Sequence, residues 1–68
     1  MSELKTKIKE RRLAMNLRQD ELAEIVGVRR ETLWRLEKGL YNPSLKLGMD
    51  LAKALQTTVE ELFEFLDD

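Results

Sequence analysis

The stretch that most restricts the fold of this 68-residue chain runs from residue 19 to residue 36, QDELAEIVGVRRETLWRL. Its apolar residues recur at helical spacing on both sides of a single glycine, Gly27. Because glycine tolerates a positive φ, Gly27 can reverse the chain between two helices, and the small Ala23 lets the two backbones approach. The stretch therefore predicts two short helices that cross at a steep angle, with apolar residues burying the crossing. These residues are Leu22, Ala23, Val26, Val28, Leu33 and Leu36.

The second of these helices, predicted over residues 29–38 and ended by Gly39, would expose long polar side chains. Its outward-facing residues are Arg29, Arg30, Glu31 and Arg35. Side chains of this kind can hydrogen-bond to the edges of base pairs in the major groove of DNA. The pattern predicts a helix-turn-helix DNA-binding protein.

The four polar residues of this helix are expected to play different parts. Arginine reads guanine through paired bonds to O6 and N7, worth about 1–3 kcal/mol of discrimination. Arg30 lies in the first turn and is the expected main base reader, whereas Arg29 would be shared with the DNA backbone. Glu31 either accepts a bond from cytosine or pairs with Arg35, four residues further along the same face.

The charge distribution supports this interpretation better than the net charge of −1. Residues 1–38 carry ten of the twelve Lys and Arg against seven acids, a net charge of +3. Residues 39–68 carry two basic residues against six acids, a net charge of −4. Basic residues clustered on one face favour nucleic-acid binding, and the acidic half would then face away from DNA. The alternative is that such halves arise by chance in a short, charge-rich helical chain.

The N-terminal segment predicts an amphipathic helix over residues 3–15. One face would consist of Leu4, Ile8 and Met15. Ser2 is the candidate N-cap, and Asn16 would end the helix because asparagine accepts a left-handed conformation.

The C-terminal half predicts two more helices. Residues 40–44, LYNPS, form a turn, and Ser44 would cap a helix over residues 45–55. The buried positions of that helix are expected to be Leu47, Leu51, Ala52 and Leu55. A capping box from Thr58 to Glu61 would open a last short helix. This last helix would carry Val59, Leu62, Phe63, Phe65 and Leu66. Residues 1–68 are thus expected to form a single all-α domain, a compact bundle of five helices.

Two polar features of the motif need an explanation. Arg18 stands where the helix beginning at Gln19 needs an N-cap, and arginine cannot accept a hydrogen bond. Either Asp20 compensates through the helix dipole, or Arg18 reaches a phosphate. Gln19 could hold a phosphate oxygen together with the helix N-terminus. Glu37 follows a buried leucine, and Arg12 is its expected partner, in a pair that could fix how two helices dock.

The C-terminal residues 58–68 predict a dimerisation tail. A chain of this size has difficulty burying Phe63, Phe65 and Leu66 within one copy, and contiguous exposed apolar surface usually marks an interface. A symmetric dimer would present two recognition helices about 34 Å apart, one turn of B-DNA. Alternatively, Phe63 belongs to the monomer core and the tail frays.

Several function classes fit the sequence poorly. The chain contains no His and no Cys, so the commonest general base and nucleophile are missing and no enzyme is expected. No cofactor or metal site is suggested, and neither a membrane span nor a signal peptide is expected, which favours a cytoplasmic protein that joins the nucleoid when bound to DNA. The rival interpretation is an antitoxin or protein-interaction module with Trp34 and the Phe-rich tail as contact residues.

The run from residue 17 to residue 63 resembles the phage-repressor type (Cro-like, XRE-type) helix-turn-helix transcriptional regulators, particularly their short stand-alone members. The resemblance covers roughly residues 4–63. Its most specific parts are Gln19-x-x-Leu22-Ala23-x-x-Val26-Gly27-Val28, Thr32 to Gly39 with Glu37, and Tyr41-Asn42-Pro43-Ser44-Leu45. The resemblance implies a lambda-repressor-like domain that binds a palindromic or pseudo-palindromic operator in double-stranded DNA as a homodimer. Repression is the default expectation, and a regulatory protein partner is the expected switch.

The resemblance also implies roles for individual residues. The major groove would be faced by Arg29, Arg30, Glu31 and Arg35. The DNA backbone would be contacted by Gln19, Thr32, Lys38, Tyr41, Asn42 and Lys46, to which the reasoning above adds Arg18. Family members often pair an arginine of the first helix with the glutamate that Glu37 matches, which again indicates Arg12.

The sequence departs from the family pattern at three positions. Arg18 stands where Thr or Ser usually caps the second helix, and Arg29 replaces a common Ser or Thr. Both changes favour contacts with phosphate or guanine. Trp34 replaces a small polar residue; it could cover the edge of the core, lie along a deoxyribose or join a protein contact.

Overall fold

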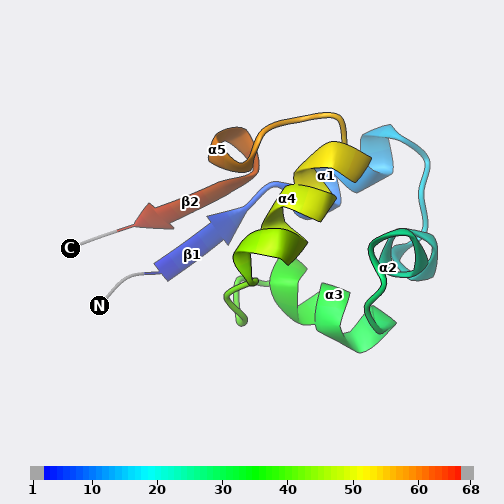
Figure 1. Cartoon of the computed structure of the whole chain (residues 1–68), viewed down its shortest axis with the longest axis horizontal. Coiled ribbons are helices and arrows are strands. Elements are labelled where there is room, and N and C mark those ends of the chain that lie inside the picture. Colours follow the sequence, from blue (N-terminus) through cyan, green and yellow to red (C-terminus); the bar gives the residue numbers. More distant parts are fainter. Residues whose placement is uncertain (1–2, 67–68) are drawn as a thin grey trace.

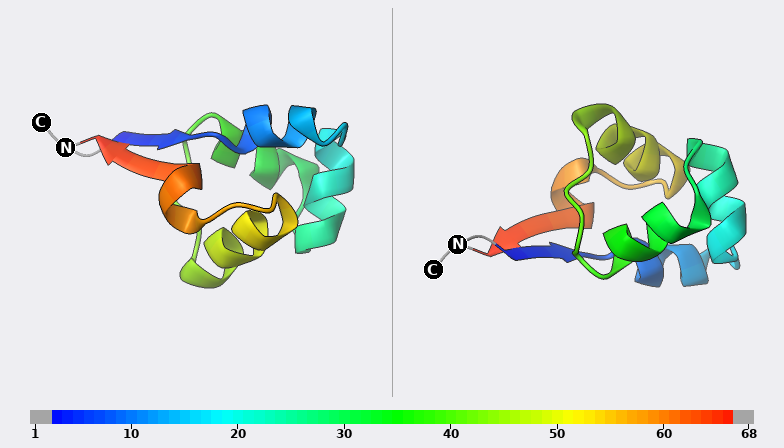
Figure 2. Two further views of the ribbon diagram at one scale, coloured as in Figure 1. Left: turned by 90° about the horizontal axis from the view of Figure 1, so that it is seen from above. Right: turned by 90° about the horizontal axis from the view of Figure 1, so that it is seen from below.

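The computed structural model describes residues 3–66, which form five helices and a two-stranded antiparallel sheet (Figure 1). In chain order the elements are β1 (Glu3–Thr6), α1 (Ile8–Ala14), α2 (Gln19–Val26), α3 (Arg30–Glu37), α4 (Leu45–Ala54), α5 (Val59–Leu62) and β2 (Phe63–Leu66). The two strands project from one end of the molecule, and α2 lies at the other end (Figure 2). The predicted five helices are confirmed, but the all-α assignment is wrong because of the sheet. No helix within residues 3–66 combines the length and apolarity needed to cross a membrane.

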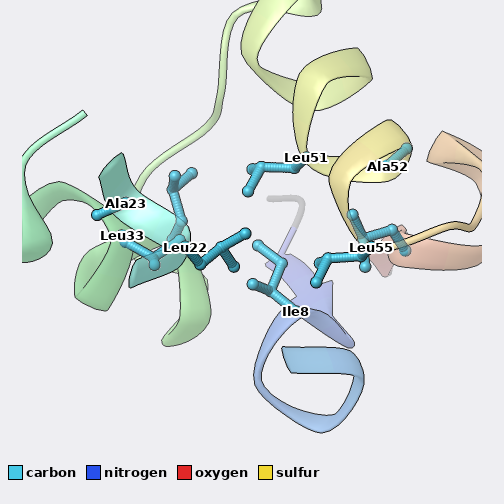
Figure 3. Close-up of a cluster of buried hydrophobic side chains, with 9 residues drawn as sticks. Ile8, Leu22, Ala23, Leu33, Leu51, Ala52 and Leu55 are labelled. Atoms are coloured by element: carbon cyan, nitrogen blue, oxygen red, sulfur yellow. The ribbon is translucent and has the colours of Figure 1, made fainter. Parts of the chain in front are cut away.

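The core lies where all five helices converge. Its largest fully buried side chains are Ile8, Leu22, Leu33, Leu36, Leu51, Leu55 and Leu62. Figure 3 shows Ile8 of α1 and Leu51 of α4 pointing into the same cluster as Leu22 of α2. Each such side chain contributes about 1.5–3 kcal/mol when fully buried. The predicted helix faces of residues 19–36 and 45–55 are therefore the ones that build the core.

The N-terminal segment differs from its prediction. Residues 3–15 do not form one helix, since residues 3–6 are extended and α1 begins only at Ile8. Leu4 and Ile8 are four residues apart, a spacing that fits a strand of period two as well as a helix. Met15 lies outside α1 and is exposed, so it does not extend the buried face. The proposed cap at Ser2 lies outside the described residues, and the residue preceding α1 is Lys7.

The C-terminal segment differs in the same way. The last helix ends at Leu62, and residues 63–66 form β2 instead of continuing the helix. The register pairs Leu4 with Phe65 and Thr6 with Phe63, which places these four side chains on one face. The other face carries Glu3, Lys5, Glu64 and Leu66. Successive side chains of each strand point to opposite faces of the sheet. Each strand is too short for its sequence alone to indicate that it pairs with the other.

The predicted chain reversals occur at the predicted residues. Asn16 has a φ of 57°, Gly27 a φ of 75° and Gly39 a φ of 73°. After both α2 and α3, two backbone N–H groups bond back into the last turn; Val28 donates to Ala23 (3.0 Å) and Leu40 to Arg35 (2.9 Å). Gly39 meets a second requirement, because a Cβ there would collide with the backbone carbonyl oxygen of Leu4 in β1.

The predicted caps are present at α4 and α5. The Ser44 hydroxyl accepts from the backbone N–H of Leu47 (3.1 Å), and the Thr58 hydroxyl accepts from that of Glu61 (3.1 Å). The Glu61 carboxylate, in contrast, accepts from the hydroxyl of Thr57 (3.1 Å) and from Arg11 (3.0 Å). Only the forward half of the predicted capping box is therefore formed.

Candidate nucleic-acid interface

The side of α3 that faces away from the core is polar and exposed. Leu33 and Leu36 are fully buried on the inner side. The outer side presents Arg30, Glu31, Trp34 and Arg35, which together line a shallow depression on the surface. A helix with its inner side fixed in this way, and with long side chains outside, has the form required to enter the major groove.

A chain of hydrogen bonds connects the first exposed arginine of α3 to the interior. Arg12 of α1 donates from Nε to Glu37 Oε2 (2.7 Å) and from Nη2 to Oε1 (3.3 Å). Gln19, at the start of α2, donates from Nε2 to the same Glu37 Oε1 (3.0 Å). The Oε1 atom of Gln19 then accepts from Nη1 of Arg30 (3.3 Å). Four residues from three helices are thus joined in one network, which we call the α1–α2–α3 network.

The buried part of this network contains the predicted Arg12–Glu37 pair. The two side chains are only 9% and 5% exposed, and Arg12 also donates to the backbone carbonyl of Leu17 (2.9 Å). A buried pair contributes little net stability, but removal of one partner leaves an uncompensated charge. The network therefore fixes the docking of α1 against α3, as the sequence predicted.

The position of Gln19 in the network was not evident from the sequence. It was predicted to hold a phosphate, whereas in the structure both ends of its side-chain amide have protein partners. Gln19 and Glu37 belong to different helices, and their contact depends on how these helices pack. The spacing of residues in the sequence therefore does not predict it. The arrangement holds Arg30 beside the N-terminus of α2, an end of a helix that attracts anions.

Three further predicted base-contacting residues are exposed. Arg29 lies just before α3 with an extended backbone (φ −75°, ψ 152°) and has no side-chain cap bond. Glu31 and Arg35 are both exposed, and no ion pair joins them among the residues that the structure describes. The predicted alternative, an ion pair between Glu31 and Arg35, is therefore not formed in this structure.

The N-terminus of α2 is capped by acids instead of by its N-cap side chain. The Glu21 carboxylate accepts from the backbone N–H of Arg18 (2.7 Å), and Asp20 accepts from Nε of Arg18 (3.2 Å). The hydrogen bond from Arg18 lowers the pKa of Asp20, and the hydrogen bond to Asp20 raises the pKa of Arg18. Asp20 thus pairs with the side chain of Arg18, while Glu21 bonds to the backbone of this N-cap residue. Compensation by Asp20 through the helix dipole and a phosphate contact of Arg18 both stay predictions. Arg18 remains largely exposed, so this pair does not bury its charge.

The residues predicted to contact phosphates lie along the end of α3 and the loop after it. Lys38, Tyr41, Asn42 and Lys46 are exposed, and Thr32 is half-buried. Lys46 is paired with Asp50 (2.7 Å), in the manner of a surface pair. Lys38 lies over the Trp34 ring, with its Nζ 5.8 Å from the ring centroid.

Two of the three predicted dimer residues, Phe63 and Phe65, belong to a separate surface, which we call the sheet groove. It is an apolar groove between the sheet and α4, lined by Leu4, Pro43, Ser44, Leu45, Gly48, Val59, Phe63 and Phe65. Phe63 is half-buried and packs against the core, while Phe65 is 54% exposed. Leu66, which is 39% exposed, lies on the opposite face of the sheet. The sequence reasoning missed Leu45, which is the first residue of α4 and is 77% exposed.

Acidic residues do not form a metal site in the described part of the chain. Within residues 3–66 there is no group of three or more His, Cys, Asp or Glu side chains that could hold a metal ion.

Comparison with known proteins agrees with this geometry. The HTH_3 helix-turn-helix family model matches residues 8–62. An uncharacterized HTH-type transcriptional regulator of Archaeoglobus fulgidus is 52% identical over 62 residues, covering 91% of this chain and 87% of that protein.

Solved structures give the same result. The restriction-modification controller protein C.AhdI of Aeromonas hydrophila has a TM-score of 0.74 and 34% identity, covering 81% of this chain and 83% of that one. SinR, the master regulator for biofilm formation, solved in complex with DNA, has a TM-score of 0.72 and 31% identity, covering 79% of this chain and 87% of that one. These matches are to regulators and not to an enzyme family. The chain therefore belongs to the helix-turn-helix family of DNA-binding transcriptional regulators.

Proposed function

We propose that this protein is a sequence-specific repressor that binds a palindromic operator as a homodimer, with α3 in the major groove. The observation that carries the proposal is the α1–α2–α3 network, which ties the exposed Arg30 through Gln19 to a buried ion pair. A long side chain normally loses conformational entropy when it binds a base, and Arg30 is already held by a partner. Repression follows from simple occupation of DNA by a compact domain, which requires no additional surface.

The assignment of contacts follows the exposed side of α3. Arg30 and Arg35 would read guanines, Glu31 would accept from cytosine N4, and Arg29 would be shared with the backbone. Phosphates would be bound along the rim by Arg18, Thr32, Lys38, Tyr41, Asn42 and Lys46. Gln19 would join them through the second N–H of its side-chain amide, since its bond to Glu37 uses only one of the two. In this proposal Arg18 and Lys46 exchange surface acids for phosphates, which costs little because exposed ion pairs contribute only about 0–1 kcal/mol.

The test is selection of bound sites from random duplexes, followed by binding measurements on the selected site. We expect a two-fold symmetric site with half-sites one helical turn apart and a binding constant that falls steeply with salt. Replacement of Arg30 by Ala should relax the preference at one base pair per half-site by about 1–3 kcal/mol. The control is Lys53→Ala, which removes an exposed cation of α4 outside the proposed interface. If the affinity for the selected site survives replacement of Arg29, Arg30 and Arg35 together, the recognition role of α3 is wrong.

The homodimer is proposed to form through the sheet groove. Phe65 and Leu45 leave apolar surface exposed on both sides of this groove, and a second copy related by a two-fold axis would cover it. Phe63 contributes from the groove wall, whereas Leu66 lies on the opposite face of the sheet and is left out of this interface. This surface lies at the sheet end of the molecule (Figure 1), and it shares no residue with the depression on the outer side of α3.

Sedimentation of two matched variants tests the dimer. Phe65→Glu should shift the mass to that of a monomer, because it places a charge on a surface that must lose water. Leu13→Glu introduces the same charge at another exposed leucine, on α1, and should leave the dimer intact. A dimer mass retained by Phe65→Glu would exclude this interface without affecting the assignment of α3.

A further inference from the structure

Trp34 is an exposed aromatic residue at the centre of the proposed recognition surface. Trp34 is 44% exposed, whereas Leu33 and Leu36 on the inner side of the same helix are fully buried. Arg30, Trp34 and Lys38 are spaced four residues apart, so they form one line along the outer side of α3. Glu31 and Arg35 form the neighbouring line, and the depression they share with Trp34 opens to solvent.

The indole does not complete the core of one copy. Within the described residues the indole interacts with Lys38, whose ammonium lies 5.8 Å from the ring centroid. Trp34 is flanked along the helix by charges that favour phosphates and base edges, so an apolar partner would have to lie between them. Covering a large apolar ring of this kind is favourable in proportion to the area removed from water.

The chemistry of the major groove narrows the choice of partner. Its floor offers hydrogen-bonding groups from all four bases and only one kind of apolar group, the C5-methyl of thymine. We propose that Trp34 is a further specificity-determining residue that packs its indole against a thymine methyl group between the bases contacted by Arg30 and Arg35. This proposal rests on the proposed function, since it requires α3 to lie in the major groove.

The chain offers a direct probe, because Trp34 is its only tryptophan. Indole fluorescence is expected to change in intensity and wavelength when the protein binds the selected duplex. Binding itself is followed separately by the anisotropy of a dye on the DNA, so the two signals are independent. Normal anisotropy with unchanged indole fluorescence would overturn the inference and leave the proposed function standing.

Thymine contact is tested by replacing each thymine of the half-site in turn with deoxyuridine, which removes only the methyl group. At one position per half-site we expect binding by the wild-type protein to weaken by about fourfold, the effect of one buried methyl-sized group. Trp34→Ala should bind the thymine and deoxyuridine duplexes equally, whereas Trp34→Phe should keep part of the difference. Leu13→Ala, which truncates an exposed leucine of α1, should discriminate like the wild type.

The remaining outcomes are distinguishable. If the wild-type protein discriminates at no thymine, or if Trp34→Ala keeps the discrimination, Trp34 does not read a methyl group. A change in self-association of Trp34→Ala with unchanged DNA binding would assign the indole to a protein contact and overturn the inference. Absence of sequence-specific binding by the wild-type protein in the anisotropy measurement would overturn the proposed function as well.

Discussion

The two ends of the molecule are stabilised in different ways. At the helical end, the Arg12–Glu37 pair of α1 and α3 is buried, Gln19 of α2 is half-buried, and each of these polar side chains has a partner in the α1–α2–α3 network. At the sheet end, Phe65 is 54% exposed and the buried hydroxyl of Thr6 has no hydrogen-bond partner. A satisfied polar network specifies one arrangement of helices, whereas exposed apolar surface is typical of an interface. The helical end is therefore complete within a single copy, whereas the sheet end leaves the apolar surface to which the proposed second copy would bind.

The largest expected effect lies in the buried part of the network. Arg12→Ala should lower the free energy of unfolding by about 3–5 kcal/mol, because it leaves the Glu37 carboxylate buried without its cation. The matched control is Arg11→Ala, which breaks the exposed pair with Glu61 and should cost about 0–1 kcal/mol. Urea unfolding of the two variants gives the comparison. Equal losses of unfolding free energy in the two variants would show that the buried pair contributes no more to stability than an exposed one.

This first prediction also shows what the sequence could reveal. The crossing of α2 and α3 was predictable because Gly27 and the apolar spacing on both sides of it lie within one segment. The Arg12–Glu37 pair between α1 and α3 was predictable because Glu37 follows a buried leucine and needs a cationic neighbour. The sheet was not, since a spacing of four residues between Leu4 and Ile8 fits both a helix and a strand. Its two strands lie at opposite ends of the chain, and only their pairing in the fold makes either one a strand.

The functional residues divide in the same manner. The exposed side of α3 follows directly from the buried positions of Leu33 and Leu36, so Arg30 and Arg35 could be assigned to it from the sequence. The contact of Gln19 with Arg30 could not, because it depends on the angle at which α2 and α3 cross. The part of the sheet groove formed by Leu45 was missed because β2, which forms the other side of the groove, was predicted as a helix.

Two glycines sharpen the comparison, since both have a positive φ but only one touches the sheet. Gly27→Ala should cost about 1–2 kcal/mol, the penalty of a left-handed conformation, because no other atom approaches a Cβ there. Gly39→Ala should cost more, because the added Cβ meets the Leu4 carbonyl and must displace β1. Unfolding free energies and hydrogen exchange of the β1 amides measure the two effects. Equal costs, with protection of β1 unchanged, would contradict the close approach.

A smaller effect of opposite sign is expected at the sheet. Thr6→Val replaces a buried hydroxyl that lacks a partner with a methyl group of similar shape. We expect stability to rise by about 1 kcal/mol, because an unsatisfied polar group no longer has to be desolvated. Thermal unfolding measures the change, and Thr57→Val is the control, because the Thr57 hydroxyl is bonded to Glu61 and its loss should not stabilise. A loss of stability in Thr6→Val would show that its hydroxyl is satisfied in solution.

The smallest effect is the pH dependence of the cap of α2. The folded protein has a lowered pKa at Asp20 relative to the ordinary value of 3.8, so the pair with Arg18 stabilises the fold above that pH. The contribution should disappear as the pH falls from about 4 through the folded-state pKa. Asp20→Asn and Arg18→Ala should each remove this component from unfolding curves measured between pH 7 and pH 3. If the double variant loses more of the pH dependence than either single variant, Asp20 and Arg18 do not contribute to it as one pair.

The pairing of Glu3 with Leu66 has a practical consequence for any larger arrangement of this domain. It brings the two strand ends nearest the termini side by side at the tip of the sheet, and α2 lies at the far end of the molecule (Figure 1). An extra domain joined beyond these strand ends would therefore be attached at the end of the molecule opposite α2. Two copies could likewise be linked in tandem by a short flexible connector, which would raise the effective concentration of one for the other.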